Sequence, residues 1–371
     1  MKHFTVHQDP EVDARVQHDL ALIRDGLLAE VPEAEALVLV GAFGRGEGTV
    51  VRGPTGPRAY NDYDLVLVHP RRVAVPDLTP RRRELARALG VTHVDVEVLE
   101  SEGLAQLPPT MHAHDLKHGG WVLHGNPEVL ARVPDIAGSA VDAGAARLLL
   151  FNRLTCLLEC VRAPFFAEAP EGAERFWMAY MTAKVMLSVG AALLVRRGLY
   201  HHGYRERLAR FRNAFAAEPE LVRMLEVATA LKVDPPPEVE DPRPAWFAVR
   251  ARYLALVKEM AEEALGERFA GWDALAKAYE GDRARDAFRK VKWWVLDRRK
   301  HEDIVNSGRR KDVELAEIYL TAAVREAGGF DPELTARGRE RLAAHAQEPL
   351  ADWESCRVAA VRLDLTHVHP T

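Results

Sequence analysis

Two pairs of acidic residues have the spacing in this sequence that could support chemistry. Asp62 and Asp64 lie in the stretch NDYDLVLV, and Asp95 and Glu97 lie in VDVEV, about thirty residues further on. Both stretches have a strand pattern, and residues two apart on a strand point to the same face. Carboxylates that lie so close together repel one another unless a cation separates them, and Mg²⁺ prefers oxygen ligands. The pattern therefore predicts a two-ion magnesium site suited to phosphoryl or nucleotidyl transfer.

The stretch before the first acidic pair, LVLVGAFGRGEG, places four glycines directly after an apolar strand. Such glycines let main-chain N–H groups approach a phosphate because no Cβ stands in the way; a loose surface loop is the alternative. The spacing is not that of a P-loop, since Glu47 follows Gly46 where a lysine is needed, nor that of a dinucleotide fingerprint. An isolated D-x-D pair also ends ordinary solvated strands, but here the turn and a second acidic strand accompany it.

The elements that must position these residues follow from the apolar periodicity. The predicted elements are helices at 11–31 and 81–90, strands at 36–44, 62–70 and 91–99, and a hairpin or loop at 48–61. After Val141 the strand signals largely vanish and helical patterns follow. We therefore predict an α+β fold, with an α/β catalytic domain and small mixed sheet over 1–135 and an all-helical domain over 136–371. The proline-rich loop 232–244 is interpreted as a helix connection within that second domain.

Composition is that of an ordinary globular protein. The 371 residues are 48% hydrophobic and 28% charged, with a net charge of −5. This charge argues against general affinity for nucleic acid, which depends on phosphate neutralisation, although the arginines at 81–83 leave a local basic groove open. Few cysteines and an N-terminal stretch unlike a secretion signal favour the cytoplasm. The apolar run 178–195 contains Lys184 and is flanked by arginines, so we predict a buried helix and no membrane span.

The glycine-rich turn, the D-x-D strand and the third acidic strand together resemble the nucleotidyltransferases of the DNA polymerase beta superfamily. The similarity is to the minimal and antibiotic nucleotidyltransferases, which join such a domain to a helical bundle. It covers about residues 35–100 by motif and the remainder only by general organisation. The resemblance implies that Asp62 and Asp64 bind two Mg²⁺ ions, that Asp95 is the third ligand with Glu97 as the alternative, and that an NTP is the donor, ATP being favoured.

The resemblance also implies roles around the turn. Gly41, with the backbone of Ala42 and Gly44, would hold the triphosphate, and Arg45 would either meet a phosphate or brace the helix. Two departures stand out: Ala42 replaces the serine of the family, and the gap from Gly41 to Asp62 is longer than in minimal members. In the helical half, Lys184 would contact the triphosphate, as a lysine does in several relatives, or else snorkel to solvent or pair with a carboxylate.

The acceptor is predicted to be a small molecule, and a cationic one would suit the acidic balance. A protein or tRNA acceptor and a catalytically inactive nucleotide-binding module are the alternatives, and a homodimer is left open. The candidate wall of an acceptor pocket is His201, His202, Tyr204 and Arg205, which could equally be surface residues. The tryptophans of KWWVLDRRKH could stack a base or lie in a helix core. The histidine-rich stretch 112–127 is predicted as a helix, a glycine turn and a short strand that bridges the domains.

Overall fold

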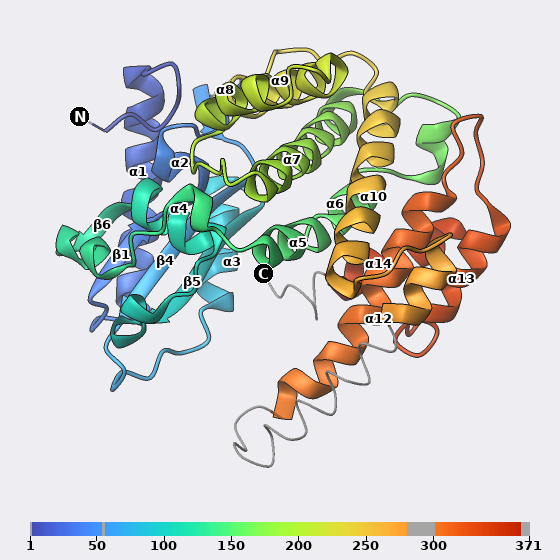
Figure 1. Cartoon of the computed structure of the whole chain (residues 1–371). Coiled ribbons are helices and arrows are strands. Elements are labelled where there is room, and N and C mark those ends of the chain that lie inside the picture. Colours follow the sequence, from blue (N-terminus) through green and yellow to red (C-terminus); the bar gives the residue numbers. More distant parts are fainter. Residues whose placement is uncertain (1, 54–55, 280–300, 365–371) are drawn as a thin grey trace. The chain divides into compact units, whose positions relative to one another are not determined.

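The computed structural model describes residues 2–53, 56–279 and 301–364, and it is a mixed α+β structure with a small four-stranded sheet (Figure 1). The described residues fall into two compact units. The first is drawn from 1–146 and 190–238, and the second from 147–189 and 239–370. The sheet belongs to the first unit, and the second is built of helices. Each unit is described by itself below.

The sheet of the first unit has the strand order β5-β4-β1-β6. Strand β1 (Ala36–Leu39) is antiparallel to both β4 (Asp62–His69) and the edge strand β6 (Trp121–Gly125), whereas β4 and β5 (His93–Glu100) are parallel. Helix α3 (Thr79–Leu89) joins the parallel pair and ends at Gly90, whose φ is +70°. The predicted mixed sheet is confirmed, and β4 and β5 lie close to their predicted ranges. The strand predicted at 36–44 ends at Leu39, because Gly41–Arg45 is helical.

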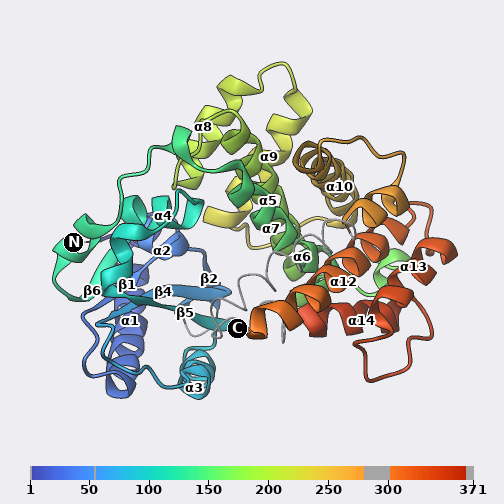
Figure 2. The ribbon, with the colours of Figure 1, turned by 60° about the horizontal axis from the view of Figure 1, so that its bottom comes forward.

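Side-chain alternation along β1 and β4 gives the sheet a hydrophobic core on each face. Odd-numbered residues of these strands pack against α1 (Pro10–Glu30) and α3, and even-numbered ones pack against α4 (Met111–Gly119) and its neighbouring short 3-10 helices at Ser101–Gln106 and Pro127–Arg132. Figure 2 shows α1 and α3 on one side of the sheet and α4 on the other. Burying each such Leu or Val contributes roughly 1.5–3 kcal/mol. Asp62 and Asp64 are even-numbered, so they share the α4 face.

Two short features connect these strands. Helix α2 (Gly41–Arg45) is a single turn that follows β1, and β2 (Val50–Gly53) and β3 (Gly56–Ala59) form an antiparallel hairpin where a hairpin or loop was predicted. The predicted helix, glycine turn and short strand in the histidine-rich stretch are α4, Gly120 and β6. The strand pairs with β1 and so completes the sheet, a role that local sequence does not reveal.

Helices α8 (Tyr204–Ala214) and α9 (Pro219–Val233) also belong to the first unit, which differs from the predicted division into 1–135 and 136–371. The Glu47 carboxylate accepts hydrogen bonds from the backbone N–H groups of Tyr204 and Arg205 at 2.6 and 3.0 Å, and so caps α8. Thr49 Oγ1 donates to the carbonyl of Lys232 at 2.5 Å. Polar contacts so distant in sequence leave no trace in periodicity. The loop 232–244 does connect two helices, but the chain also passes between the units there, at 238/239.

The second unit contains most of the remaining helices: α6 (Leu154–Glu159), α10 (Arg243–Leu265), α12 (His301–Ala323), α13 (Pro332–Leu342) and α14 (Trp353–Leu363). Helices α5 (Ala143–Phe151) and α7 (Gly172–Arg196) contribute residues to both units. By length and composition α7 could cross a membrane, yet 89% of its most apolar window is buried in the fold, which confirms the predicted buried helix. Trp293 and Trp294 lie outside the described residues.

Candidate metal centre and adjoining pocket

Three carboxylates meet where β4 and β5 run side by side. Asp62, Asp64 and Asp95 each offer an oxygen that lies within 4.8 Å of the other two, and all three side chains are half-buried. The parallel register is responsible, because it sets Asp64 opposite Asp95. Within the described ranges, no other group of three His, Cys, Asp or Glu side chains is this convergent. The structure thus brings together the three residues that the sequence singles out as metal ligands.

Neighbouring polar groups hold two of these carboxylates in place. Asn61, in the left-handed region at φ +76°, donates from Nδ2 to Asp62 Oδ2, and its carbonyl accepts from the start of β5. On α3, Arg82 donates to Asp95 Oδ1 at 2.7 Å and to the Val94 carbonyl, also at 2.7 Å. A guanidinium fixed at two points orients the carboxylate and offsets part of the negative charge of the cluster.

Glu97 shares a face with Asp95, but it lies outside the convergent group and contacts α4 instead. His112 Nε2 is 3.0 Å from Glu97 Oε2, and both side chains are partly exposed. Burial would lower the pKa of His112, but the Glu97 carboxylate, with weaker contributions from Asp115 and Asp64, outweighs it and raises the pKa. His112 therefore adds a titratable cation beside the acidic cluster. The sequence offered it only as one of several histidines in a connecting segment.

Gly41 brings the glycine turn against the acidic cluster. Its φ is +62°, and a Cβ at this position would lie 2.0 Å from Asp64 Oδ2. The backbone N–H of Val40 donates to the Asp64 carbonyl at 2.9 Å, which fixes the turn to β4. Only glycine allows both the backbone conformation and the close approach of the carboxylate.

The other glycines of the turn are required by packing and backbone conformation within the turn itself. This corrects the interpretation that their bare backbone serves to approach a phosphate. The N–H of Gly44 already donates to the Val40 carbonyl at 3.0 Å, and a Cβ there would lie 2.7 Å from the Leu39 carbonyl oxygen. Gly46, at φ +77°, ends α2, and a Cβ on Gly48 would overlap the Phe43 ring. Gly44 is thus a packing residue of the helix, and its N–H is not available to a nucleotide.

Arg45 braces the fold, the second of its two predicted roles. Its side chain is only 6% exposed, and the guanidinium lies 3.4 Å from Asp115 Oδ2, 3.8 Å from Glu47 Oε2 and over the Tyr204 ring. Burial opposes its charge, but Tyr204, Asp115, Tyr200 and Glu47 together raise its pKa above the ordinary value. Arg45 therefore stays charged and ties α2 to α4 and α8.

The arginine run at 81–83 does not form the open basic groove that the sequence allowed. Arg81 pairs with Glu30 at 2.9 Å and with Glu84 at 2.7 Å, and Arg82 is committed to Asp95. Most of the positive charge of this run is therefore compensated on the surface of the first unit.

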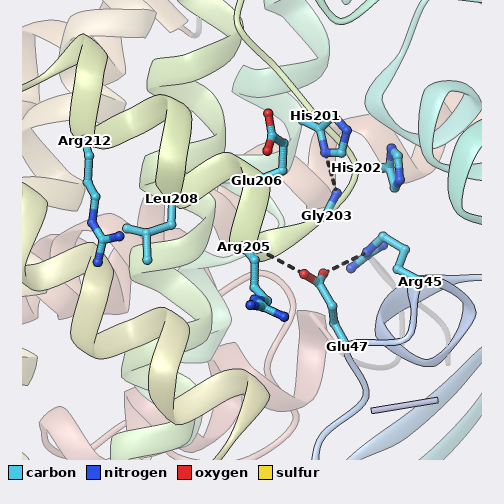
Figure 3. A pocket seen from close by; sticks show the side chains of 9 residues that line it. All are labelled: Arg45, Glu47, His201, His202, Gly203, Arg205, Glu206, Leu208 and Arg212. Atoms are coloured by element: carbon cyan, nitrogen blue, oxygen red, sulfur yellow. Dashed lines mark hydrogen bonds and ion pairs between the residues drawn. The ribbon is translucent and has the colours of Figure 1, made fainter. Parts of the chain in front are cut away.

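A pocket of about 550 Å³ opens beside Arg45 in the first unit (Figure 3). Arg45 and Glu47 contribute from the segment after β1, and the turn before α8 and α8 itself contribute the rest. The lining residues are Arg45, Glu47, His201, His202, Gly203, Arg205, Glu206, Leu208 and Arg212. Three of the four predicted wall residues therefore line a real cavity. Tyr204 is the exception, because its ring packs under the guanidinium groups of Arg45 and Arg207.

Imidazole rings gather next to this pocket. His202 stacks on His201 with ring centroids 4.1 Å apart, and it also lies near His114 and His118 of α4, at 5.9 and 6.0 Å. Burial, and then the positive charges of His201 and Arg45, lower the pKa of His202 to about 3. The Nδ1 atom of His202 is buried and has no hydrogen-bond partner. The ring is therefore neutral at physiological pH.

Lys184 lies half-buried on α7, among the residues of the second unit. Burial raises the pKa of the Cys156 thiol, and the charges of Arg153 and Lys184 oppose that rise. The contact of Lys184 with a triphosphate stays a prediction.

Cys156 and Cys160 are free and buried, as expected of core residues.

No protein-family model matches the chain, and a search of curated proteins finds no significant similarity. The function proposed below therefore depends on the residues of the chain itself.

Proposed function

We propose that the chain transfers a nucleoside monophosphate from an NTP to a small acceptor and releases pyrophosphate. The observation that carries this proposal is the convergence of Asp62, Asp64 and Asp95 beside the Gly41 turn. A strand-borne acidic triad next to a tight glycine turn is the arrangement on which the resemblance to the polymerase beta superfamily depends.

The residues fit a divalent cation. Three carboxylates lie within reach of one another, they are half-buried and still accessible to solvent, and Arg82 pairs with one of them, Asp95. Hard oxygen donors of this kind suit Mg²⁺ better than a soft metal. When bound, magnesium would neutralise phosphate charge and make the attacking hydroxyl more acidic.

The residues of the chain itself would have separate roles. The turn at Gly41 and Ala42 would place backbone N–H groups against the triphosphate, with no help from a side-chain hydroxyl, since Ala42 has none. Asp95, oriented by Arg82, would accept the proton of the acceptor hydroxyl. The acceptor oxygen would then attack the α-phosphorus, the bond to the bridging oxygen would break, and pyrophosphate would leave.

Two further features bear on the acceptor and on the cellular location. Because Arg81 and Arg82 are paired with carboxylates, a small molecule is favoured over an RNA acceptor. Free, buried cysteines suit a reducing cytoplasm.

The test is thermal stability of the full chain with each of the four NTPs, with and without Mg²⁺, beginning with ATP. A donor at a hundred times its Kd should add about 2.7 kcal/mol to the free energy of unfolding. Asp62→Asn/Asp64→Asn should abolish the Mg²⁺-dependent shift, and Asp25→Asn, an exposed change on α1, should not. Absence of a shift with every NTP would contradict the proposed activity and would favour an inactive module, in keeping with Ala42.

A further inference from the structure

The pocket beside Arg45 is locally basic in an acidic protein. Helix α8, which contributes four of the nine lining residues, carries Arg205, Arg207, Arg210 and Arg212 but only one acid, Glu206. The whole chain has a net charge of −5. A concentration of positive charge around a cavity favours entry of an anion.

Carboxylates near the pocket are already engaged by other groups. Glu206 pairs with Arg210 at 2.9 Å, and Glu226 pairs with Arg212 at 2.7 Å. Both oxygens of Glu47 accept backbone N–H groups of α8. Arg205, by contrast, is exposed at the pocket wall and has no carboxylate partner among the described residues. Hydrogen bonds from N–H groups leave the charge of Glu47 in place beside Arg45, so Arg205 is the cation of the pocket wall that is available to an anion.

Buried nitrogen atoms in the pocket wall also lack partners. The Nε atom of Arg45 has no hydrogen-bond partner, although the side chain is only 6% exposed and Glu47 Oε2 lies 3.8 Å away. His202 likewise leaves Nδ1 buried and without a partner. In Figure 3, Arg45 and His202 lie on one side of the pocket, Arg205 extends from α8 on the other, and the Glu47 carboxylate lies between Arg45 and Arg205. Buried polar atoms without partners are rare, and a ligand would satisfy them.

We propose that this pocket binds the phosphate group of a small phosphorylated molecule, and that this molecule is the acceptor. The second part rests on the proposed function; the first does not. Arginine is the side chain best matched to a phosphate, and a cavity of about 550 Å³ is of the size that holds small molecules. The cationic acceptor suggested by the overall charge is therefore replaced by an anionic one.

The pocket is placed so that a bound acceptor could reach the acidic cluster. Helix α2 touches Asp64 at its first residue, Gly41, and lines the pocket at its last, Arg45. Four residues of helix advance by about 6 Å. Helix α4 spans the same interval, since His112 contacts the Glu97 carboxylate and Asp115 contacts Arg45.

The experiment measures binding of three phosphorylated probes to the full chain by calorimetry in EDTA. The probes are inorganic phosphate, ribose 5-phosphate and glucose 1-phosphate; glucose, glucosamine and a mixed-sequence RNA 12-mer are the comparison ligands. EDTA and the Asp62→Asn/Asp64→Asn background remove any contribution from metal at the acidic cluster. Arg205→Gln is the pocket variant, and Arg223→Gln is the matched control, an exposed arginine of α9 that is outside the pocket.

At least one phosphorylated probe should bind, glucose and glucosamine should not, and Arg205→Gln should weaken binding about 10-fold while Arg223→Gln leaves it unchanged. Binding of glucosamine in preference to glucose 1-phosphate, binding of the RNA alone, no binding of any phosphorylated probe, or an equal effect of the two variants would each overturn the proposal.

Further measurements separate this proposal from the proposed function. If Arg205→Gln weakens binding of a probe but no NTP stabilises the chain, the phosphate site stands and nucleotidyl transfer does not. If MgATP and the probe compete instead of stabilising the wild-type chain additively, the pocket belongs to the NTP and the assignment to an acceptor is wrong.

Discussion

The two units of this protein each gather acidic side chains, but under opposite conditions. In the first unit, Asp62, Asp64 and Asp95 are half-buried and converge on one point. In the second, Glu314, Glu317 and Asp364 are at most 5% exposed. The first group keeps its carboxylates accessible to a ligand from solvent, whereas the second encloses them in a helical core.

The enclosed carboxylates are stabilised by protonation and by hydrogen bonds. Burial, with the neighbouring Asp364 charge, raises the pKa of Glu317 well above its usual range, and burial also raises the pKa values of Glu314 and Asp364. Thr155 Oγ1 donates to Glu317 at 2.6 Å, and Arg310 Nε donates to Glu314 at 2.8 Å. Proton uptake, internal hydrogen bonds and the Arg310 guanidinium thus take the place of a metal ion. Proximity of acids does not by itself define a metal site; convergence and access are also needed.

The largest effect should come from removing the accessible charges. Asp62→Asn/Asp64→Asn deletes two of the three proposed metal ligands, and loss of groups that merely orient a metal ligand already costs about 10- to 100-fold. We expect nucleotidyl transfer to fall by more than 100-fold, while the melting temperature in EDTA rises because like charges no longer repel. Pyrophosphate release and EDTA melting curves would check both. A lower melting temperature in EDTA would show that the Arg82 charge and the hydrogen bond from Asn61 already stabilise the cluster.

Gly41→Ala should have the next largest effect, through the backbone that supports the accessible cluster. A Cβ would strain a residue at φ +62° and collide with Asp64, so we expect a loss of about 2–5 kcal/mol in the free energy of unfolding. Gly90→Ala is the matched control, since its φ is +70° and nothing lies within 4 Å of the added Cβ. Its loss should be about 1–2 kcal/mol, from strain alone. Equal losses in urea titrations would mean that Asp64 moves aside freely.

The acidic cluster itself was accessible to sequence reasoning because strand alternation fixes it. Asp62 and Asp64 must share a face of β4, and the resemblance implied that this face borders the glycine turn. The choice between Asp95 and Glu97 was not accessible, because it depends on the register of a parallel pair, in which Asp95 stands opposite Asp64. Nothing local in the sequence sets that register.

For the pocket, the sequence indicated some of the residues but not the distant residues that they meet in the fold. His201, His202 and Arg205 were identified as candidates, but Glu47 and Arg45 lie more than 150 residues before them. Glu47 meets this segment by capping α8, and Arg45 meets it by its contact with the Tyr204 ring. For the same reason the sequence assigned α8 and α9 to a separate helical domain. Long-range polar contacts have no periodicity, so they leave no local signal.

The enclosed cluster should give a stability that falls as pH rises. Because the folded pKa of Glu317 is raised above the unfolded value near 4.5, the folded state binds more protons above that pH, and raising the pH costs up to about 1.4 kcal/mol per unit. Glu317→Gln keeps the shape without the charge, so its unfolding free energy should match wild type near pH 5 and exceed it at pH 8. Glu326→Gln, at an exposed position of the second unit, is the control. A parallel pH dependence of Glu317→Gln and wild type would show that Glu317 is not the titrating group.

The smallest effect should come from His202. Its pH dependence of stability has the opposite sign to that of Glu317, so the two units can be told apart by their pH profiles. Its pKa is lowered to about 3 in the folded state, against about 6.5 when unfolded. Between these values the unfolded chain binds more protons, so stability falls as pH drops below about 6.5. The ring is partly exposed, so solvent screens the effect, and we expect about 1 kcal/mol between pH 7 and 5. His202→Gln should flatten this part of the urea-unfolding profile, and the exposed His18→Gln should not. If His202→Gln steepened the profile instead, protonated His202 would be stabilising the first unit, and the neutral ring assigned to the pocket wall would be wrong.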